Sequence, residues 1–200
     1  MVLLLAIAAG LLAGVGWARW QGHPYQSPEL QHLWLIFVAF LPQFLVVYLP
    51  ITRKFSPGWL VVGLLLASQI FLLVFVWLNR RMMGMSIILC GVVLNTLVMM
   101  TNGGFMPISP QTASRLMSED NLRDVEPGSR FGVKDILLRP EDTRFEWLAD
   151  RNLPPSWFPY QVAFSLGDVF IALGAFWLLA KPGSSTQFTK QLLNNRGIST

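Results

Sequence analysis

Residues 59–78 read WLVVGLLLASQIFLLVFVWL and contain no charged side chain. An apolar helix of about 20 residues crosses the roughly 30 Å hydrocarbon core of a bilayer, so this stretch predicts a transmembrane helix. Tryptophans stand near both ends of the run, at Trp59 and Trp77, and the indole ring favours the headgroup level of a membrane. We therefore expect an integral membrane protein.

Four further apolar runs flank this one, at residues 2–18, 33–49, 82–100 and 159–181. The first has no basic residue before its apolar core and no small-residue cleavage site, so we interpret it as a retained span and not as a signal peptide. The whole chain is 53% hydrophobic and 13% charged, whereas soluble proteins are about one quarter charged. The sequence predicts an all-α integral membrane protein with five transmembrane helices, four of them within residues 1–100.

The long segment 101–158 differs from the rest in composition, because it holds nine of the eleven acidic residues and seven of the fifteen basic ones. Connections longer than about 15 residues are uncommon in compact proteins unless they are functional or disordered. Apolar pieces at 131–138 and 145–148 argue against full disorder. We expect a partly ordered polar cap, with a short helix after Ser109.

The orientation follows from the basic residues near the helix ends. A cytoplasmic carboxyl terminus places six bases in the inner connections and two, Arg53 and Lys54, in an outer turn. The positive-inside rule favours this choice. It makes the 101–158 cap extracytoplasmic and residues 182–200 a basic cytoplasmic tail. The inner bases are Arg19, Arg80, Arg81, Lys181, Lys190 and Arg196.

Asp168 is the only ionisable side chain well inside a predicted span, about seven residues from its start. At 1.5 Å per residue, this places the carboxyl group about 10 Å below the end of the helix. A carboxylate at that depth marks a candidate catalytic, proton-binding or ligand-orienting group. The alternative is structural, since Ser165 and Asp168 have the spacing of a capping box if the helix begins near Ser165. Both interpretations remain open.

A second polar feature lies where the fourth span ends, at Asn95 and the Asn102-Gly103-Gly104 turn. Paired glycines can turn backbone N–H groups toward an anion or a side chain such as Asp168, or they can simply end a helix. The topology brings this turn and Asp168 to one membrane face, so we expect them to meet. The predicted polar cluster comprises Asn95, Asn102, Gly103, Gly104, Pro107, Lys134, Ser165, Gly167 and Asp168.

Several classes of site are not indicated. Cys90 stands alone, and His23 and His32 have no third ligand at metal spacing, so neither a metal nor a cofactor is expected. The pI of about 9.6 reflects short basic connections and does not indicate a nucleic-acid partner. The expected partners are the lipid bilayer and, through the Gly10-x-x-x-Gly14 pair, other membrane subunits.

Three stretches together resemble a bacterial membrane family that is known only as a domain of unknown function. They are Asn-Gly-Gly-Phe-Met-Pro-Ile-Ser-Pro at 102–110, Lys134 and Thr143 in the following loop, and Phe-Ser-Leu-Gly-Asp at 164–168. The resemblance covers nearly the whole chain and implies five spans in a bacterial cytoplasmic membrane, without implying an activity. The function that we expect is a non-catalytic accessory, assembly or binding component.

A weaker resemblance connects the 164–168 motif to the lipoprotein signal peptidases, which carry an aspartate near the outer end of their last span. It implies an alternative function, an intramembrane aspartic hydrolase in which Asp168 is catalytic. Such chemistry needs a second carboxyl group that shares a proton with the first. Asp135 or Asp142 of the cap could supply it.

Overall fold

The computed structural model describes residues 2–45, 56–116, 126–132 and 134–181. The protein is mostly helical, and three of the described helices are long and apolar enough to cross a membrane. These are α1 (Val2–Trp20), α4 (Gly58–Leu78) and α5 (Met83–Thr101). Two shorter apolar helices accompany them, α2 (Trp34–Gln43) and α8 (Leu166–Ala180).

The three long helices agree with the predicted runs 2–18, 59–78 and 82–100 to within two residues at each end. The fifth helix was predicted wrongly at its start, because α8 begins at Leu166 and not near 159. Ser165 is extended and caps the helix, and Pro159 precedes it in irregular chain. Part of the second run, the bases Arg53 and Lys54, and the tail 182–200 lie outside the described residues.

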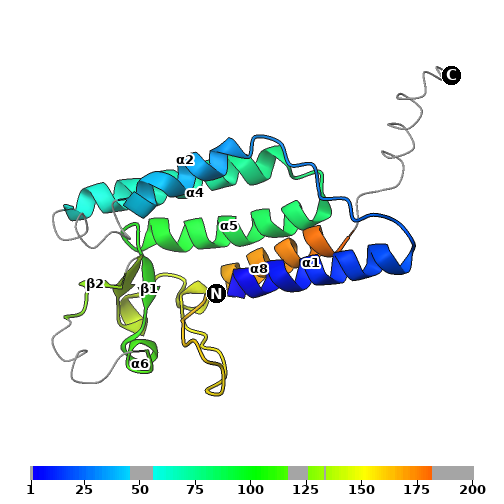
Figure 1. The fold of residues 1–200 in the computed structure, drawn as a ribbon. Coiled ribbons are helices and arrows are strands. Elements are labelled where there is room, and N and C mark those ends of the chain that lie inside the picture. Colours follow the sequence, from blue (N-terminus) through cyan, green and yellow to red (C-terminus); the bar gives the residue numbers. More distant parts are fainter. Residues whose placement is uncertain (1, 46–55, 117–125, 133, 182–200) are drawn as a thin grey trace.

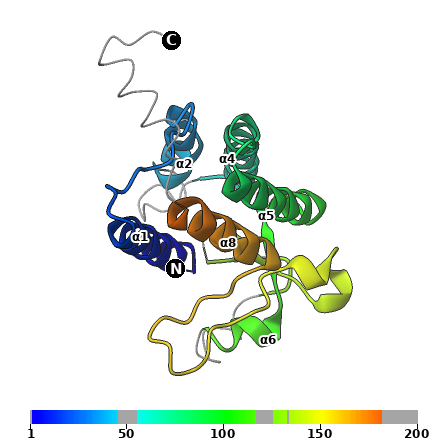
Figure 2. The same cartoon turned by 90° about the vertical axis from the view of Figure 1, so that its right-hand side faces the viewer.

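The helices run side by side, with α8 packed between α1 and α5, α5 against α4, and α4 against α2 (Figures 1 and 2). Gly10 and Gly14 of α1 face the backbone of α8 so closely that a methyl group on Gly10 would lie 2.8 Å from the Phe176 carbonyl oxygen. The close packing predicted from this glycine pair is therefore present. The helix that fills it is α8 of the same chain.

Glycines also set the contact between α5 and α8. A methyl group on Gly91 would lie 2.5 Å from the Gly167 carbonyl oxygen, and one on Gly84 would lie 2.7 Å from that of Gly174. The two glycines on each helix are seven residues apart, so they lie on one face, two turns from each other. Small residues let helix backbones approach closely, and this pairing makes α5 and α8 one tightly packed antiparallel unit.

Residues 102–116, 126–132 and 134–165 form a small cap at the end of the bundle where α5 ends and α8 begins (Figure 1). Its sheet has the order β1-β3-β2, with β1 parallel and β2 antiparallel to β3. The strands are β1 (Met106–Ile108), β2 (Arg130–Phe131) and β3 (Asp135–Leu137). The short helix expected after Ser109 is present as α6 (Pro110–Ala113), and the 3-10 turns η2 (Pro140–Asp142) and η3 (Glu146–Leu148) follow β3.

Buried apolar side chains attach the cap to the bundle. Phe105, Met106 and Leu148 of the cap form one hydrophobic cluster with residues of α4 and α5. Removing apolar surface from water contributes about 25 cal/mol per Å², so this contact stabilises the attachment of the cap. The helix residues in the cluster are Val61, Leu65, Val98 and Met99. A second cluster, inside the cap, joins Ile108, Ala113, Phe131 and Leu137.

Candidate functional site

The first turn of α8 contains a complete capping box. The Asp168 backbone N–H donates to Ser165 Oγ at 3.0 Å, and the Ser165 backbone N–H donates to Asp168 Oδ2 at 3.1 Å. The structure therefore contains the capping box that was the structural alternative for Asp168. The carboxyl group lies in the first turn of α8 and not about 10 Å below the end of the helix. A negative charge in a first turn also interacts favourably with the helix dipole.

Asn95 of α5 joins both residues of this capping box. Its Nδ2 donates to Asp168 Oδ1 at 2.9 Å, and its Oδ1 accepts from Ser165 Oγ at 2.8 Å. Gly167 makes the approach possible, because the Asn95 amide occupies the place that a side chain at 167 would need. Ser165 is fully buried and Asn95 nearly so. The three side chains form a closed hydrogen-bonded triangle that fastens the start of α8 to α5.

The turn at the end of α5 has a different partner from the one predicted. The Gly104 N–H donates to the Met99 carbonyl oxygen at 2.7 Å, and both Gly103 and Gly104 have positive φ, which is the geometry of a Schellman helix end. Among the described residues, no hydrogen bond connects this turn to Asp168. The expected approach of Asp168 to residues 102–104 is therefore wrong, because α8 starts later and meets α5 two turns earlier, at Asn95.

Asn102 instead binds the cap. Its Nδ2 donates to the carbonyl oxygens of Val98 at 2.8 Å and Arg144 at 2.9 Å, and its Oδ1 accepts from the Arg144 N–H at 2.9 Å. The side chain is 7% exposed. The Asn102 side chain thus caps the end of α5 and also binds the backbone of Arg144, which lies 42 positions later in the sequence.

A group of charged side chains, the charged layer, comprises Lys134, Asp135 and Asp150 and lies where β3, the central strand of the cap sheet, begins. Lys134 Nζ donates to Asp150 Oδ2 at 2.9 Å, and Asp150 is 1% exposed. Pro107, which is fully buried, fixes this carboxylate because its carbonyl oxygen accepts from the Asp150 N–H at 3.1 Å. The Lys134 carbonyl oxygen accepts from the Met106 N–H at 2.9 Å, so β1 positions both members of the ion pair.

The acids of this layer titrate abnormally. Burial raises the pKa of Asp135 to about 7; the positive charge of Lys134 opposes this shift, and the negative charges of Asp150 and Asp168 add to it. Burial likewise raises the pKa of Asp150. Burial alone would lower the pKa of Lys134, but the surrounding carboxylates outweigh it and raise the pKa, so the lysine remains charged.

The layer can hold a proton or a hydrogen-bond donor. Asp135 Oδ1 and Asp150 Oδ1 are buried and have no hydrogen-bond partner within the part of the chain that the structure describes. In the same part, no group of three His, Cys, Asp or Glu side chains is arranged to hold a metal ion. The predicted residues thus divide into three groups. They are the satisfied triangle (Asn95, Ser165, Asp168), which Gly167 makes possible, the turn that ends α5 (Asn102, Gly103, Gly104), and the charged layer, which contains Lys134 and is supported by Pro107.

Two polar residues of this architecture were not predicted. Asp150 is one of nine acids in the 101–158 segment, and nothing in its local sequence distinguishes it from the others. Asn79 makes the same type of clamp at the end of α4 as Asn102 makes at the end of α5. An asparagine directly after an apolar run is a helix-ending signal, so Asn79 could have been found.

Comparison with known proteins adds one finding. The model of a protein family described only as a family of unknown function (DUF5317) matches residues 27–180. No curated protein and no solved structure matches the chain. The matched segment begins after α1 and contains the remaining helices, the cap and every residue of the triangle and the charged layer.

Proposed function

Because the chain belongs to the family of unknown function DUF5317, we propose its role from its own geometry, as a non-catalytic accessory, assembly or binding component of a membrane. In this proposal, five helices span a bacterial cytoplasmic membrane, with the cap extracytoplasmic and the carboxyl terminus cytoplasmic. The second span contains α2, and α8 with the chain before it forms the fifth. The distribution of basic residues supports the orientation.

One observation carries the non-catalytic proposal. Both carboxylate oxygens of Asp168 accept structural hydrogen bonds, Oδ1 from Asn95 and Oδ2 from the Ser165 N–H. A general base must be within reach of a substrate proton, and a residue that holds its own helix start is poorly placed to act as one. The triangle is better suited to holding a rigid cap at the membrane surface, where Trp147 of the cap is 57% exposed.

A specific experiment tests the binding role. A photoreactive amino acid at position 147 should form a discrete cross-linked complex in native membranes, and the same amino acid at position 20, at the opposite end of the bundle, should not form it. Asn95→Ala should weaken the complex, because it frees the start of α8 beneath the cap. A cap that cross-links to nothing except lipid would contradict the proposal.

The alternative, an aspartic hydrolase, is favoured by one feature of the charged layer. Asp168 lies close enough to Asp135 and Asp150 for its charge to raise the pKa of each, and paired carboxyl groups with separated pKa values are the pattern of acid–base catalysis. Asp168→Asn separates the two functions. Loss of a proteolytic product from membranes while the folded variant accumulates normally would support the hydrolase.

A further inference from the structure

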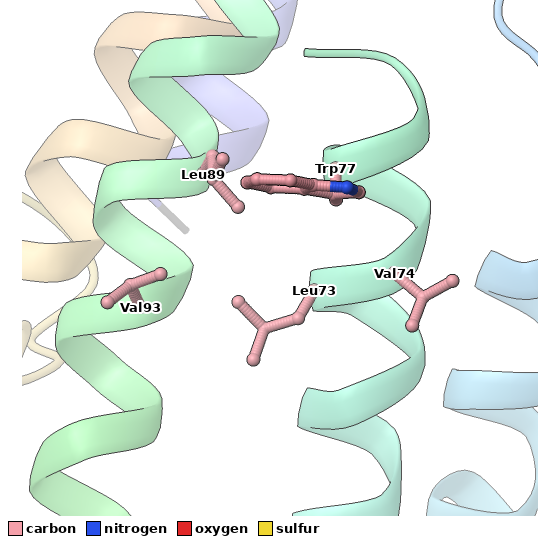
Figure 3. Close-up of a pocket in the computed structure, with 5 residues that line it drawn as sticks. All are labelled: Leu73, Val74, Trp77, Leu89 and Val93. Carbon is pink, nitrogen blue, oxygen red and sulfur yellow. The ribbon is translucent and has the colours of Figure 1, made fainter.

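Figure 3 shows a groove between α4 and α5. Its lining residues come from the end of α4 and from the part of α5 up to Val93, away from the cap. It is an open groove with a volume of about 310 Å³, and it is lined by Leu73, Val74 and Trp77 of α4 and by Leu89 and Val93 of α5. This volume falls at the lower end of the roughly 300–1,000 Å³ typical of ligand pockets. The indole of Trp77 reaches from α4 toward Leu89 and closes one end of the groove (Figure 3).

The residues that line the groove indicate what kind of molecule binds there. The atoms that face the groove are apolar, so an occupant gains dispersion contacts there. A transmembrane helix from another subunit would be expected to use small residues for close approach, and the lining contains none. Both α4 and α5 are candidate membrane spans, so hydrocarbon chains are the molecules available at this depth.

The closed end of the groove carries positive charge. The Arg80 guanidinium lies 4.1 Å from the centroid of the Trp77 ring, and its Nη1 donates to the Trp77 carbonyl oxygen at 2.8 Å. A guanidinium has five N–H donors in a geometry that matches phosphate, and this bond uses one of them. Arg81 follows directly and is exposed. A basic site beside a gap between transmembrane helices fits an anionic headgroup.

We propose that the α4–α5 groove binds an anionic phospholipid, with one acyl chain along Leu73, Leu89 and Val93 and its phosphate against Arg80 and Arg81. The Trp77 ring lies between the acyl-chain part and the phosphate part of the site. In this arrangement it contacts the acyl chain, and it also packs against the Arg80 guanidinium. This binding site does not depend on the function proposed for the cap. It requires only that α4 and α5 lie in a bilayer.

Photolabelling of the full chain in lipid nanodiscs tests the site. The probe is phosphatidylglycerol with a diazirine in its acyl chain, compared with phosphatidylcholine that carries the same group. We expect phosphatidylglycerol to label residues 73–93 several-fold more than phosphatidylcholine does, and more than it labels the lipid-exposed Leu12 of α1. Excess unlabelled phosphatidylglycerol should lower this labelling. The comparison uses the wild-type protein, without any substitution.

Substitutions then test the headgroup contact. One basic residue near a membrane surface contributes about fivefold in affinity for anionic lipid, so Arg80→Gln and Arg81→Gln should each lower labelling about fivefold. Arg19→Gln is the matched control, since Arg19 is an exposed arginine that ends α1 at the same end of the bundle, and it should change nothing. Equal labelling by both lipids, equal labelling of Leu12, or cross-links from the groove to another protein chain would overturn the proposal.

Discussion

Asn79 and Asn102 occupy the same position after two successive helices and make the same three hydrogen bonds. Each Nδ2 donates to the carbonyl oxygen four residues earlier, at 2.8 Å in both cases. Each amide also pairs with the backbone N–H and carbonyl of one distant residue, Gln31 for Asn79 and Arg144 for Asn102. The two clamps lie at opposite ends of the bundle and hold the connection before α2 and the cap, respectively.

Asn102→Ala should release the cap without unfolding the helices. The substitution leaves the N–H and carbonyl of Arg144 without their partner, and an unsatisfied buried polar group costs about 1–3 kcal/mol. We expect the cap to be cleaved faster at Arg144 by trypsin and the free energy of unfolding to fall by that amount. Asn152→Ala is the control, because the hydrogen bond that the Asn152 side-chain amide donates to the Phe164 carbonyl oxygen is exposed and long, at 3.3 Å. Equal trypsin sensitivity of the two variants would count against the clamp.

Gly91→Ala should separate α5 from α8, since the added methyl group would lie 2.5 Å from the Gly167 carbonyl oxygen. We expect a lower melting temperature in detergent and a weakened Asn95–Asp168 contact. Gly63→Ala is the matched control, a glycine within α4 with nothing inside 4 Å of the added carbon. In a helix interior, alanine is favoured over glycine by up to about 1 kcal/mol, so this variant should be unchanged or more stable. A melting temperature for Gly91→Ala at or above the control would be inconsistent with the close pairing.

Asn95→Asp should make stability depend on pH more steeply than it does in the wild type, whereas Asp168→Asn should not. The first change places a second carboxylate against Asp168, and like charges at hydrogen-bond distance repel unless one takes up a proton. We expect the variant to lose more stability between pH 5 and pH 8 than the wild type does. Asp168→Asn keeps the size of the side chain and should cost about 1–3 kcal/mol, the range for a compromised buried hydrogen bond. Thermal unfolding at the two pH values measures both, and a loss of stability for Asn95→Asp no larger than that of the wild type would argue against the triangle.

The cap should lose stability as the pH rises from about 4 to about 7. The pKa of Asp135 is about 7 in the folded protein against an ordinary 3.8, so in this window the folded state retains a proton that the unfolded chain has released. Stability falls with pH wherever the folded state binds more protons. Asp150 shifts in the same direction, and it is expected to steepen the slope.

Asp135→Asn removes one of these protons. The slope should become shallower, and at pH 8 the variant should exceed the wild type by about 1–2 kcal/mol, less than the full shift implies because partial exposure screens the charge. Asp142→Asn, an exposed acid of η2, should leave the slope unchanged. Chemical unfolding monitored at several pH values provides the comparison, and parallel profiles for wild type and Asp135→Asn would refute it.

The sequence predicted the elements that depend on local composition and failed where tertiary contacts decide. Apolar length places α1, α4 and α5, because lipid requires long uninterrupted runs. The capping box of Ser165 and Asp168 was also visible, but the requirement for a full-length fifth span favoured an earlier start. Because the predicted helix began too early, Asp168 was placed too deep in the span and was predicted to contact the turn at Asn102.

The predicted polar cluster contained Asn95, but the choice of Asn95 over Asn102 as the partner of Asp168 could not be read from the chain. Asn95 lies 73 residues before Asp168, and the register that joins them is set by Gly84 and Gly91 against Gly174 and Gly167. The seven-residue spacing of these glycines is visible in both helices, yet it acquires meaning only when the two are paired antiparallel. Asp150 differs from the other acids of the cap in its partners, the Pro107 carbonyl oxygen and Lys134. Tertiary folding brings both of them to it.

The late start of α8 affects the membrane around the protein. Fifteen helical residues at 1.5 Å each extend about 22 Å, whereas the hydrocarbon core is about 30 Å thick. In the five-span arrangement, the bilayer beside α8 must become thinner, or the irregular chain that ends in the Asn152–Phe164 bridge must lie within it, shielded by α1 and the cap. Hydrophobic mismatch of this kind would make the protein sensitive to acyl-chain length, with thinner membranes favouring the folded cap.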